Sequence, residues 1–296
     1  MNKIILIQLL VSSLLIGGVY ALISIGLTLI FGVMRIVNFA HGEFLMLAMF
    51  ACYWMVELTG LSPYVTVPFV VLLLFLFGVI IYVLIIRRTV GSPMVVQIFA
   101  TVGLSLFMEN MALVLWSGDY RTIGSFASSA GFSVAGIQVN YALFIAFLVA
   151  ITVSLLLFAF VAWTYPGKAI RATVQDRTAA QLMGINIDKV FLLTFAIGSG
   201  LVGIAGALLA PSYAIFPTVG TNFVLAAFVV VVLGGMGSMT GALIGGLLIG
   251  LIETFSGFFI APELKQAFYF IVFILVLVFR PAGLMGQRGA EEIGLK

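Results

Sequence analysis

Long apolar runs without charge follow one another along most of the chain, and short segments that carry the charged residues separate them. A straight helix needs about 20 apolar residues to cross the hydrocarbon core of a bilayer. Several runs fall short of this length and border glycine-rich breaks, so they are either full helices with frayed ends or half-helices that meet inside the protein. The pattern predicts an all-α polytopic membrane protein with eight to ten transmembrane helices, some short or broken. The runs are Ile4–Phe31, Gly42–Val56, Val65–Ile86, Val95–Trp116, Tyr141–Trp163, Val190–Ala210, Phe223–Leu233, Ala242–Ile260 and Ala267–Phe279.

Composition supports this class. Of the 296 residues, 64% are hydrophobic and 8% are charged, whereas soluble domains carry about 25% charged residues. No stretch is long and polar enough to fold as a separate soluble domain, so residues 1–296 are expected to form one transmembrane domain. The first apolar run exceeds the roughly 7–15 residues of a signal-peptide core and lacks a cleavage site after it, which predicts a retained first span.

The distribution of positive charge predicts the orientation. With nine crossings and the N-terminus outside, ten of the Lys and Arg residues fall on one side and three on the other. The positive-inside rule makes the richer side cytoplasmic. Residues 117–140 then form an external loop, and residues 164–188 form the largest internal loop. The cytoplasmic set is Arg35, Arg87, Arg88, Lys168, Arg171, Arg177, Lys189, Arg280, Arg288 and Lys296; Lys3, Arg121 and Lys265 are external.

A polar cluster lies between the first two apolar runs. Arg35, Asn38, His41 and Glu43 occur within nine residues, a density that suits an irregular or re-entrant connection whose backbone groups need partners inside the protein. One interpretation is structural, with His41 as a hydrogen-bonding strut. The other places Asn38 or Glu43 against a translocation cavity, and the sequence favours neither.

Two further carboxylates fall within apolar runs. Glu109 follows Thr101 and Ser105 on nearly the same helical face, and a polar stripe on a spanning helix faces protein or water rather than lipid. Glu109 is expected to be paired within the bundle with the help of Asn110, and the alternative is a pathway or proton-relay residue. Glu253 lies near the end of its run, from which its side chain can reach the surface.

The internal loop has mixed character. Its sequence predicts a single helix with Lys168 and Arg171 on a polar face, ended by Gly184. A basic face suits lipid headgroups. The short segment from Ala179 and Ala180 to Gly184 alternatively suits docking into a groove of another protein.

A weak internal repeat relates two helix starts. His41–Phe50 can be laid over Gly220–Val229, with opposite orientations in the membrane, as in transporters whose pathway follows the interface of inverted repeats. We expect four polar residues to gather near that interface and to brace or line a mostly apolar passage. The passage would make few polar contacts to the transported substrate. They are Asn38, Glu43, Glu109 and Asn222.

Sequence signals for catalysis are lacking. The chain has no phosphate-binding P-loop, no HExxH helix and no GxSxG elbow. With a single cysteine, Cys52, and a single histidine, it is not expected to build a metal site or to hold a cofactor. An intramembrane enzyme therefore has no positive support.

Five motifs in order resemble the LivH-type permease of branched-chain amino acid ABC importers, and the resemblance spans almost the whole chain. They are NFAHGEFLML (Asn38–Leu47), TVGLSLFMEN (Thr101–Asn110), GKAIRATVQD (Gly167–Asp176) continuing to LMGIN (Leu182–Asn186), VLGGMGS (Val232–Ser238) and RPAGLMG (Arg280–Gly286).

The resemblance implies a multi-pass subunit of the bacterial inner membrane. It would pair with a second, related permease, two cytoplasmic ATP-binding subunits and a periplasmic binding protein, and the partners would hydrolyse the ATP. The implied load is branched-chain or other hydrophobic amino acids. Alternatives are urea or short amides within the same family, or a proton-coupled secondary transporter that uses His41, Glu43 or Glu109 as proton carrier.

The same resemblance implies a site of ATPase coupling in the internal loop. Its segment looks like the coupling loop of ABC importers, usually Glu-Ala-Ala-x-x-x-Gly, although Thr178 replaces the Glu and the later Leu-Pro element is missing. The coupling residues implied are Lys168, Arg171, Asp176, Ala179, Ala180 and Gly184.

Overall fold

The computed structural model describes residues 3–124 and 130–286. Within them, eight helices are long and apolar enough to cross a membrane, and a ninth apolar helix, α11, is shorter. The predicted all-α membrane class is therefore confirmed. The elements are α1 Lys3–Met34, α2 His41–Thr59, α3 Pro63–Ile81, η1 Tyr82–Ile86, α4 Arg87–Thr89, α5 Met94–Trp116, β1 Gly131–Val134, β2 Ile137–Asn140, α7 Tyr141–Trp163, α8 Tyr165–Gln175, α9 Arg177–Leu182, α10 Ile187–Leu209, α11 Val219–Gly234, α12 Met239–Phe259, η2 Pro262–Leu264 and α13 Lys265–Phe279.

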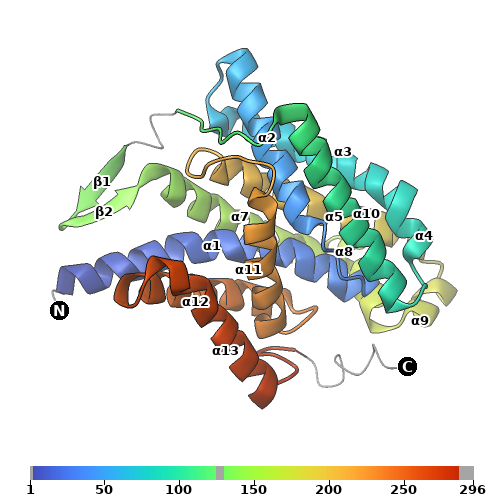
Figure 1. Ribbon diagram of the computed structural model, residues 1–296. Coiled ribbons are helices and arrows are strands. Elements are labelled where there is room, and N and C mark those ends of the chain that lie inside the picture. The colour runs from blue at the N-terminus through green and yellow to red at the C-terminus, as the bar shows by residue number, and fades with distance from the viewer. Residues whose placement is uncertain (1–2, 125–129, 287–296) are drawn as a thin grey trace.

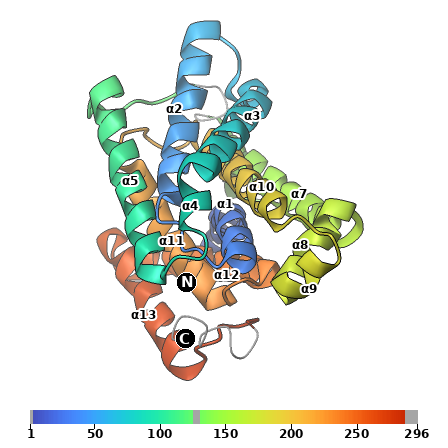
Figure 2. The ribbon, with the colours of Figure 1, turned by 90° about the vertical axis from the view of Figure 1, so that its right-hand side faces the viewer.

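Helix α1 forms the centre of the molecule. Figure 2 looks nearly along its axis, with the other helices arranged around it. Small residues allow the helices to pack closely around α1. In lipid no hydrophobic effect drives helices together, so close van der Waals contact between their backbones must stabilise the packing. A Cβ added to Gly246 of α12 would lie 2.5 Å from the backbone of Ala21, and one added to Gly250 would lie 2.5 Å from Gly17.

Hydrogen bonds assign the two ends of α1 to opposite sides of the molecule. Gln8, near its start, bonds to the backbone of Gln138 in the β1–β2 hairpin at 2.8 and 2.7 Å. Near its end, the carbonyl of Val33 accepts a bond from Arg177 of α9 at 3.2 Å. We call these ends the hairpin side and the α8–α9 side (Figure 1). The hairpin lies in the predicted loop 117–140, where the sequence analysis did not predict strands.

The starts of α2 and α11 meet inside the protein. A Cβ on Gly42 would clash with the carbonyl group of Gly220, and a Cβ on Gly220 would clash with that of Gly42. These two helix starts belong to the segments that the sequence relates as a repeat, and the repeat itself stays a prediction.

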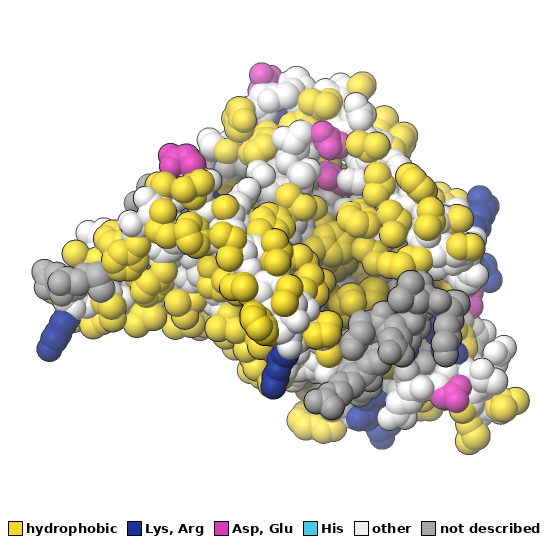
Figure 3. Space-filling model, turned by 60° about the horizontal axis from the view of Figure 1, so that its bottom comes forward, with side chains coloured by type: hydrophobic (Ala, Val, Ile, Leu, Met, Phe, Trp, Pro, Cys, Tyr) yellow, Lys and Arg dark blue, Asp and Glu magenta, His cyan; other side chains and the backbone are white. Residues whose placement is uncertain are grey.

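The outer helices expose apolar side chains. Hydrophobic residues cover much of the face shown in Figure 3, where charged side chains are few and most lie toward its margins. On α13 nearly all side chains other than Tyr269 are accessible. A surface this apolar suits lipid or another membrane protein rather than water.

Candidate functional site

The polar segment at residues 35–43 is irregular for only part of its length. The backbone leaves helix α1 at Arg35, which has a positive φ of 58°, and α2 begins at His41. The expectation that His41 and Glu43 belong to an irregular connection is therefore wrong, because both lie in the first turn of α2. Asn38 remains in the connection; it is buried, and its Oδ1 has no hydrogen-bond partner among the described residues.

His41 joins α2 to the central helix. Its Nε2 lies 3.1 Å from the carbonyl oxygen of Ile23, and its side chain is buried. A carbonyl oxygen can only accept, so Nε2 carries the proton in this contact. The His41 ring also lies close to Gly26 of α1, because a Cβ added to that glycine would lie 3.5 Å from Cε1 of His41. This geometry fits the interpretation of His41 as a hydrogen-bonding strut, and the role of the residue stays a prediction.

Glu43 faces α5. Its Oε1 accepts a hydrogen bond from Ser105 at 3.2 Å, whereas the buried Oε2 has no partner in the described part of the chain. Thr101 donates to the carbonyl of Val37 at 3.1 Å. Two members of the predicted polar stripe on α5 thus contact the first turn of α2 and the connection that leads into it.

Glu109, the third member of that stripe, is half-buried and lies within electrostatic range of Glu43. The expected pairing is not observed, since neither ion pair among the described residues involves Glu109. Asn110 is exposed and donates to the carbonyl of Leu106 instead. Two carboxyl groups therefore lie near each other on the α2–α5 face without a cation between them in the described chain.

Asn222 lines a different cavity, of about 330 Å³, between α1, α11 and the start of α13. Glu253 belongs to the same cavity, and the expectation that it reaches the surface is wrong. Its side chain is 8% exposed and its Oε1 lies 2.7 Å from Nζ of Lys265. The sequence does not show this pair directly, because the two residues lie on different helices joined by a turn. The available clue to a partner for Glu253 was Lys265, one of three basic residues predicted to be external.

The segment 164–188 forms two helices, and the expectation of a single helix is wrong. Asp176 adopts an extended backbone, with φ −154°, between α8 and α9. Its Oδ1 accepts a hydrogen bond from the amide of Ala179 at 3.0 Å, which makes it the N-cap of α9. Thr164 caps α8 in the same way through Gly167.

Helix α9 presents an apolar end. Ala180 lies on the buried face of α9, whereas the side chains of Leu182 and Met183 are 84% and 83% exposed. Gly184 follows with φ of 84° and open space around its Cα, as expected for a glycine that ends a helix in the left-handed region. Lys168, Arg171 and Ala179 are exposed on the same side of the molecule.

Arg177 anchors α9 to the membrane domain, a role that the sequence analysis did not assign to it. Besides its bond to Val33, its guanidinium stacks 5.1 Å over the ring of Phe191. Burial lowers the pKa of Arg177, and the nearby Arg35 lowers it further. A cavity of about 340 Å³ lies beside it, between the end of α1 and the break at Asp176.

Comparison with known proteins identifies the family. Residues 9–277 match the family model described as branched-chain amino acid transport system / permease component. The permease protein BraD of the high-affinity branched-chain amino acid transport system of Pseudomonas aeruginosa is 32% identical, over 97% of this chain and 98% of its own. The corresponding LivH of Escherichia coli is 32% identical over 94% of both chains.

A more distant relative transports a sugar. The ribose import permease protein RbsC of Haemophilus influenzae is 29% identical over 80% of this chain and 73% of its own. No solved structure matches the chain significantly. The family model covers nearly all of the membrane helices, and relatives match at full length; the chain therefore belongs to the family of branched-chain amino acid transport system permease components.

Proposed function

We propose that the chain is the permease subunit of an ATP-driven importer for branched-chain or other hydrophobic amino acids in a bacterial inner membrane. The observation that carries the proposal is a membrane domain with full-length similarity to such permeases and with an exposed apolar helix end on one side. Its partners would be a second homologous permease, forming a heterodimer, two ATP-binding subunits and a periplasmic binding protein. The α8–α9 side would be cytoplasmic, because the basic residues gather there.

Reconstitution tests this function. The permease is purified with the products of its neighbouring genes, sealed in vesicles, and supplied with labelled L-leucine and the binding protein. We expect uptake that requires ATP and survives an ionophore that collapses the proton gradient. Uptake that continues without ATP but stops with the ionophore would establish a secondary transporter instead. Uptake of urea or acetamide in place of L-leucine would establish the amide load.

The coupling contact would be the α8–α9 pair. An ATP-binding subunit transmits its movement through a contact with the permease, and α9 offers two exposed apolar side chains, Leu182 and Met183, at its end. Ala180 and Arg177 hold α9 against the membrane domain, which would pass a push on α9 to the end of α1. Lys168, Arg171, Asp176, Ala179 and Gly184 complete the surface in this proposal.

The passage would follow the α2–α5 face. A buried carboxylate oxygen without a partner is costly. Oε2 of Glu43 has none within the described part of the chain, and water in a passage, or a group of the second permease, would satisfy it. The buried amide oxygen of Asn38 likewise lacks a partner among the described residues, and Glu109 is the acid next to Glu43. His41 would brace this face rather than carry a proton, since its Nε2–H is committed to Ile23.

Neutralising Glu43 tests this passage. The Glu43→Gln variant should insert normally but lower ATP-driven uptake about tenfold, because the loss of one charge-assisted contact is worth about 1.5 kcal/mol or more. Glu57→Gln is the matched control, since Glu57 lies on the same helix and is exposed; its uptake should stay within about twofold of the wild type. Equal uptake by both variants would remove Glu43 from the pathway.

A further inference from the structure

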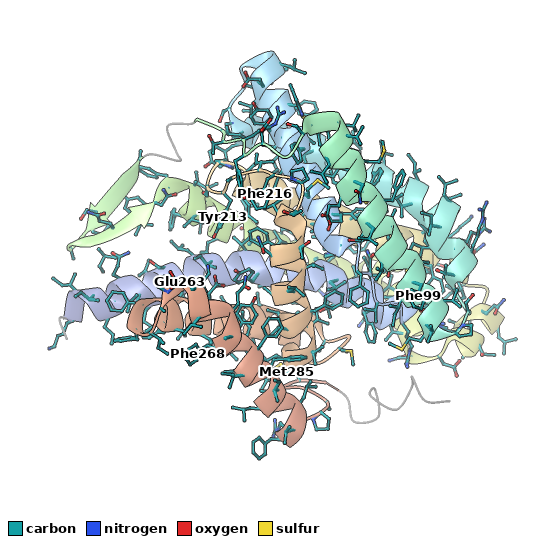
Figure 4. All side chains as sticks on the ribbon, in the orientation of Figure 1. Phe99, Tyr213, Phe216, Glu263, Phe268 and Met285 are labelled. Carbon is teal, nitrogen blue, oxygen red and sulfur yellow. The ribbon has the colours of Figure 1, made fainter. Side chains whose placement is uncertain are left out.

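The cavity beside Glu253 has the composition of a ligand site. Its volume of about 330 Å³ falls in the range of small-molecule pockets, about 300–1,000 Å³. Aromatic side chains form much of its wall: Tyr20, Tyr213, Phe216, Phe223 and Tyr269. Tyr213 and Phe216, labelled in Figure 4, come from the connection that precedes α11.

The acid in this cavity is only half satisfied. Glu253 Oε1 binds Lys265 at 2.7 Å, and its buried Oε2 has no hydrogen-bond partner among the described residues. Lys265 Nζ carries three protons, of which the ion pair uses one, and its side chain is 44% exposed. The pair thus offers an acceptor oxygen and free donors side by side. The phenol of Tyr20 lies near hydrogen-bonding range of the carboxylate, and a ligand group on Oε2 would compete with it, whereas the phenols of Tyr213 and Tyr269 lie within electrostatic range.

We propose that this cavity binds the zwitterionic head of an amino acid, with Glu253 Oε2 accepting from its ammonium group and Lys265 Nζ donating to its carboxylate. The inference rests on the proposed function and adds a substrate site to it. The Glu253–Lys265 pair is neutral overall, and so is a zwitterion. An anion or a cation alone would leave an uncompensated charge in a partly buried site, which is costly.

The walls suit the rest of such a ligand. Tyr213 and Phe223 meet edge to face at 5.5 Å, and Tyr20 lies 6.3 Å from the ring of Phe223. These rings would contact an apolar side chain, while the amide of Asn222, which also lines the cavity, would supply a polar contact at its edge. Such a site departs from our expectation from the sequence, in which the protein makes few polar contacts to its substrate.

Binding measurements on the assembled transporter in lipid nanodiscs, without its binding protein, test the site. The three probes are L-leucine, L-leucinamide, which lacks the carboxylate, and N-acetyl-L-leucine, which lacks the ammonium group. Glu253→Gln should weaken L-leucine and L-leucinamide about tenfold or more, because a charged partner is lost, but should not weaken N-acetyl-L-leucine, whose carboxylate would still meet Lys265. Lys265→Gln should weaken L-leucine and N-acetyl-L-leucine and spare L-leucinamide.

Glu263→Gln is the matched control, because Glu263 is exposed in the same turn, outside the cavity lining (Figure 4). A merely structural ion pair would make both variants lose all three probes alike, and that result, or unchanged L-leucine binding in both, would overturn the proposal.

A second measurement does not depend on disrupting the ion pair. In a Cys52→Ala background, Asn222→Cys places a thiol in the cavity and Glu263→Cys places one outside it. L-leucine should slow the reaction of the first thiol with a water-soluble thiol reagent at least about threefold and leave the second unchanged; equal rates with and without L-leucine at Asn222→Cys would refute the site.

ATP-driven L-leucine uptake by the wild type separates this site from the proposed function. If uptake occurs and the site tests fail, only the site is wrong. If uptake does not occur, the proposed function is wrong.

Discussion

Replacing Leu182 and Met183 together by aspartate is expected to abolish ATP-driven uptake while the permease still inserts and folds. Both side chains are more than 80% exposed, so their loss should change the free energy of unfolding little. Apolar anchors that fill a partner's groove, however, are worth about 2 kcal/mol or more each in an interface. The loss of both anchors, about 4 kcal/mol or more, should weaken the binding of the ATP-binding subunits by about several hundredfold or more.

The measurement has two parts. Co-purification of the ATP-binding subunits reports docking, and labelled L-leucine uptake reports transport. Leu58→Asp provides the control, because Leu58 is 78% exposed at the end of α2, which lies far from α8 and α9 (Figures 1 and 2). This variant should leave docking unchanged. If the double variant retained both its ATP-binding subunits and its uptake, the coupling contact would have to lie elsewhere.

A finer variant separates docking from the transmission of movement. Gly184 adopts φ of 84°, a conformation that costs other L residues roughly 1 kcal/mol or more. Gly184→Val should therefore shift the end of α9 without removing its apolar side chains. We expect the ATP-binding subunits to remain bound and to hydrolyse ATP without driving uptake, and Ala179→Arg should act in the same way by adding bulk to the exposed face.

Much of this fold could be predicted from the sequence, because the bilayer imposes a simple rule on it. Apolar runs locate the spans, and the small residues of α1 and α12 mark the faces that pack, as Gly17 and Gly250 do. The break at Asp176 could have been recognised as well, since aspartate is one of the residues most favoured at the N-cap of a helix, and α9 begins directly after Asp176. The hairpin at residues 131–140 lacked any such clear signal.

The polar contacts were harder to predict, because they depend on how helices rotate against one another. The stripe of Thr101 and Ser105 predicted a face but not its partner, which is the start of α2. Glu253 was misjudged because its distance from the helix end said nothing about the turn that brings Lys265 against it. Hydropathy reports the depth of a residue in the membrane, whereas function depends on its neighbours in three dimensions.

Replacing Gly42 by valine should have the largest effect on folding. A Cβ at this position would meet the carbonyl of Gly220 and the side chain of Val224 on α11, so the starts of α2 and α11 would have to separate. Overpacking in a close-packed interior costs about 1–3 kcal/mol, and more where backbone must move. We expect the Gly42→Val protein to aggregate on detergent extraction or to lose its helical signal at a much lower temperature.

Gly103→Val is the control that isolates this cause. Gly103 also lies within an apolar helix, α5, yet a Cβ added there would meet no atom within 4 Å, so the variant should keep the wild-type melting temperature within a few degrees. Equal stability of the two variants would show that the Gly42–Gly220 contact is not needed for the fold.

If only Gly42→Val is destabilised, the starts of α2 and α11 act as a single packed unit, and any passage along the α2–α5 face must open by movement elsewhere. Helix α5 borders that face. Among the hydrogen bonds described, only the hydroxyls of Thr101 and Ser105 join it to the start of α2 and to the connection before it. Hydrogen bonds of this kind contribute about 0.5–1.5 kcal/mol each, which is weak enough for them to be exchanged during a transport cycle.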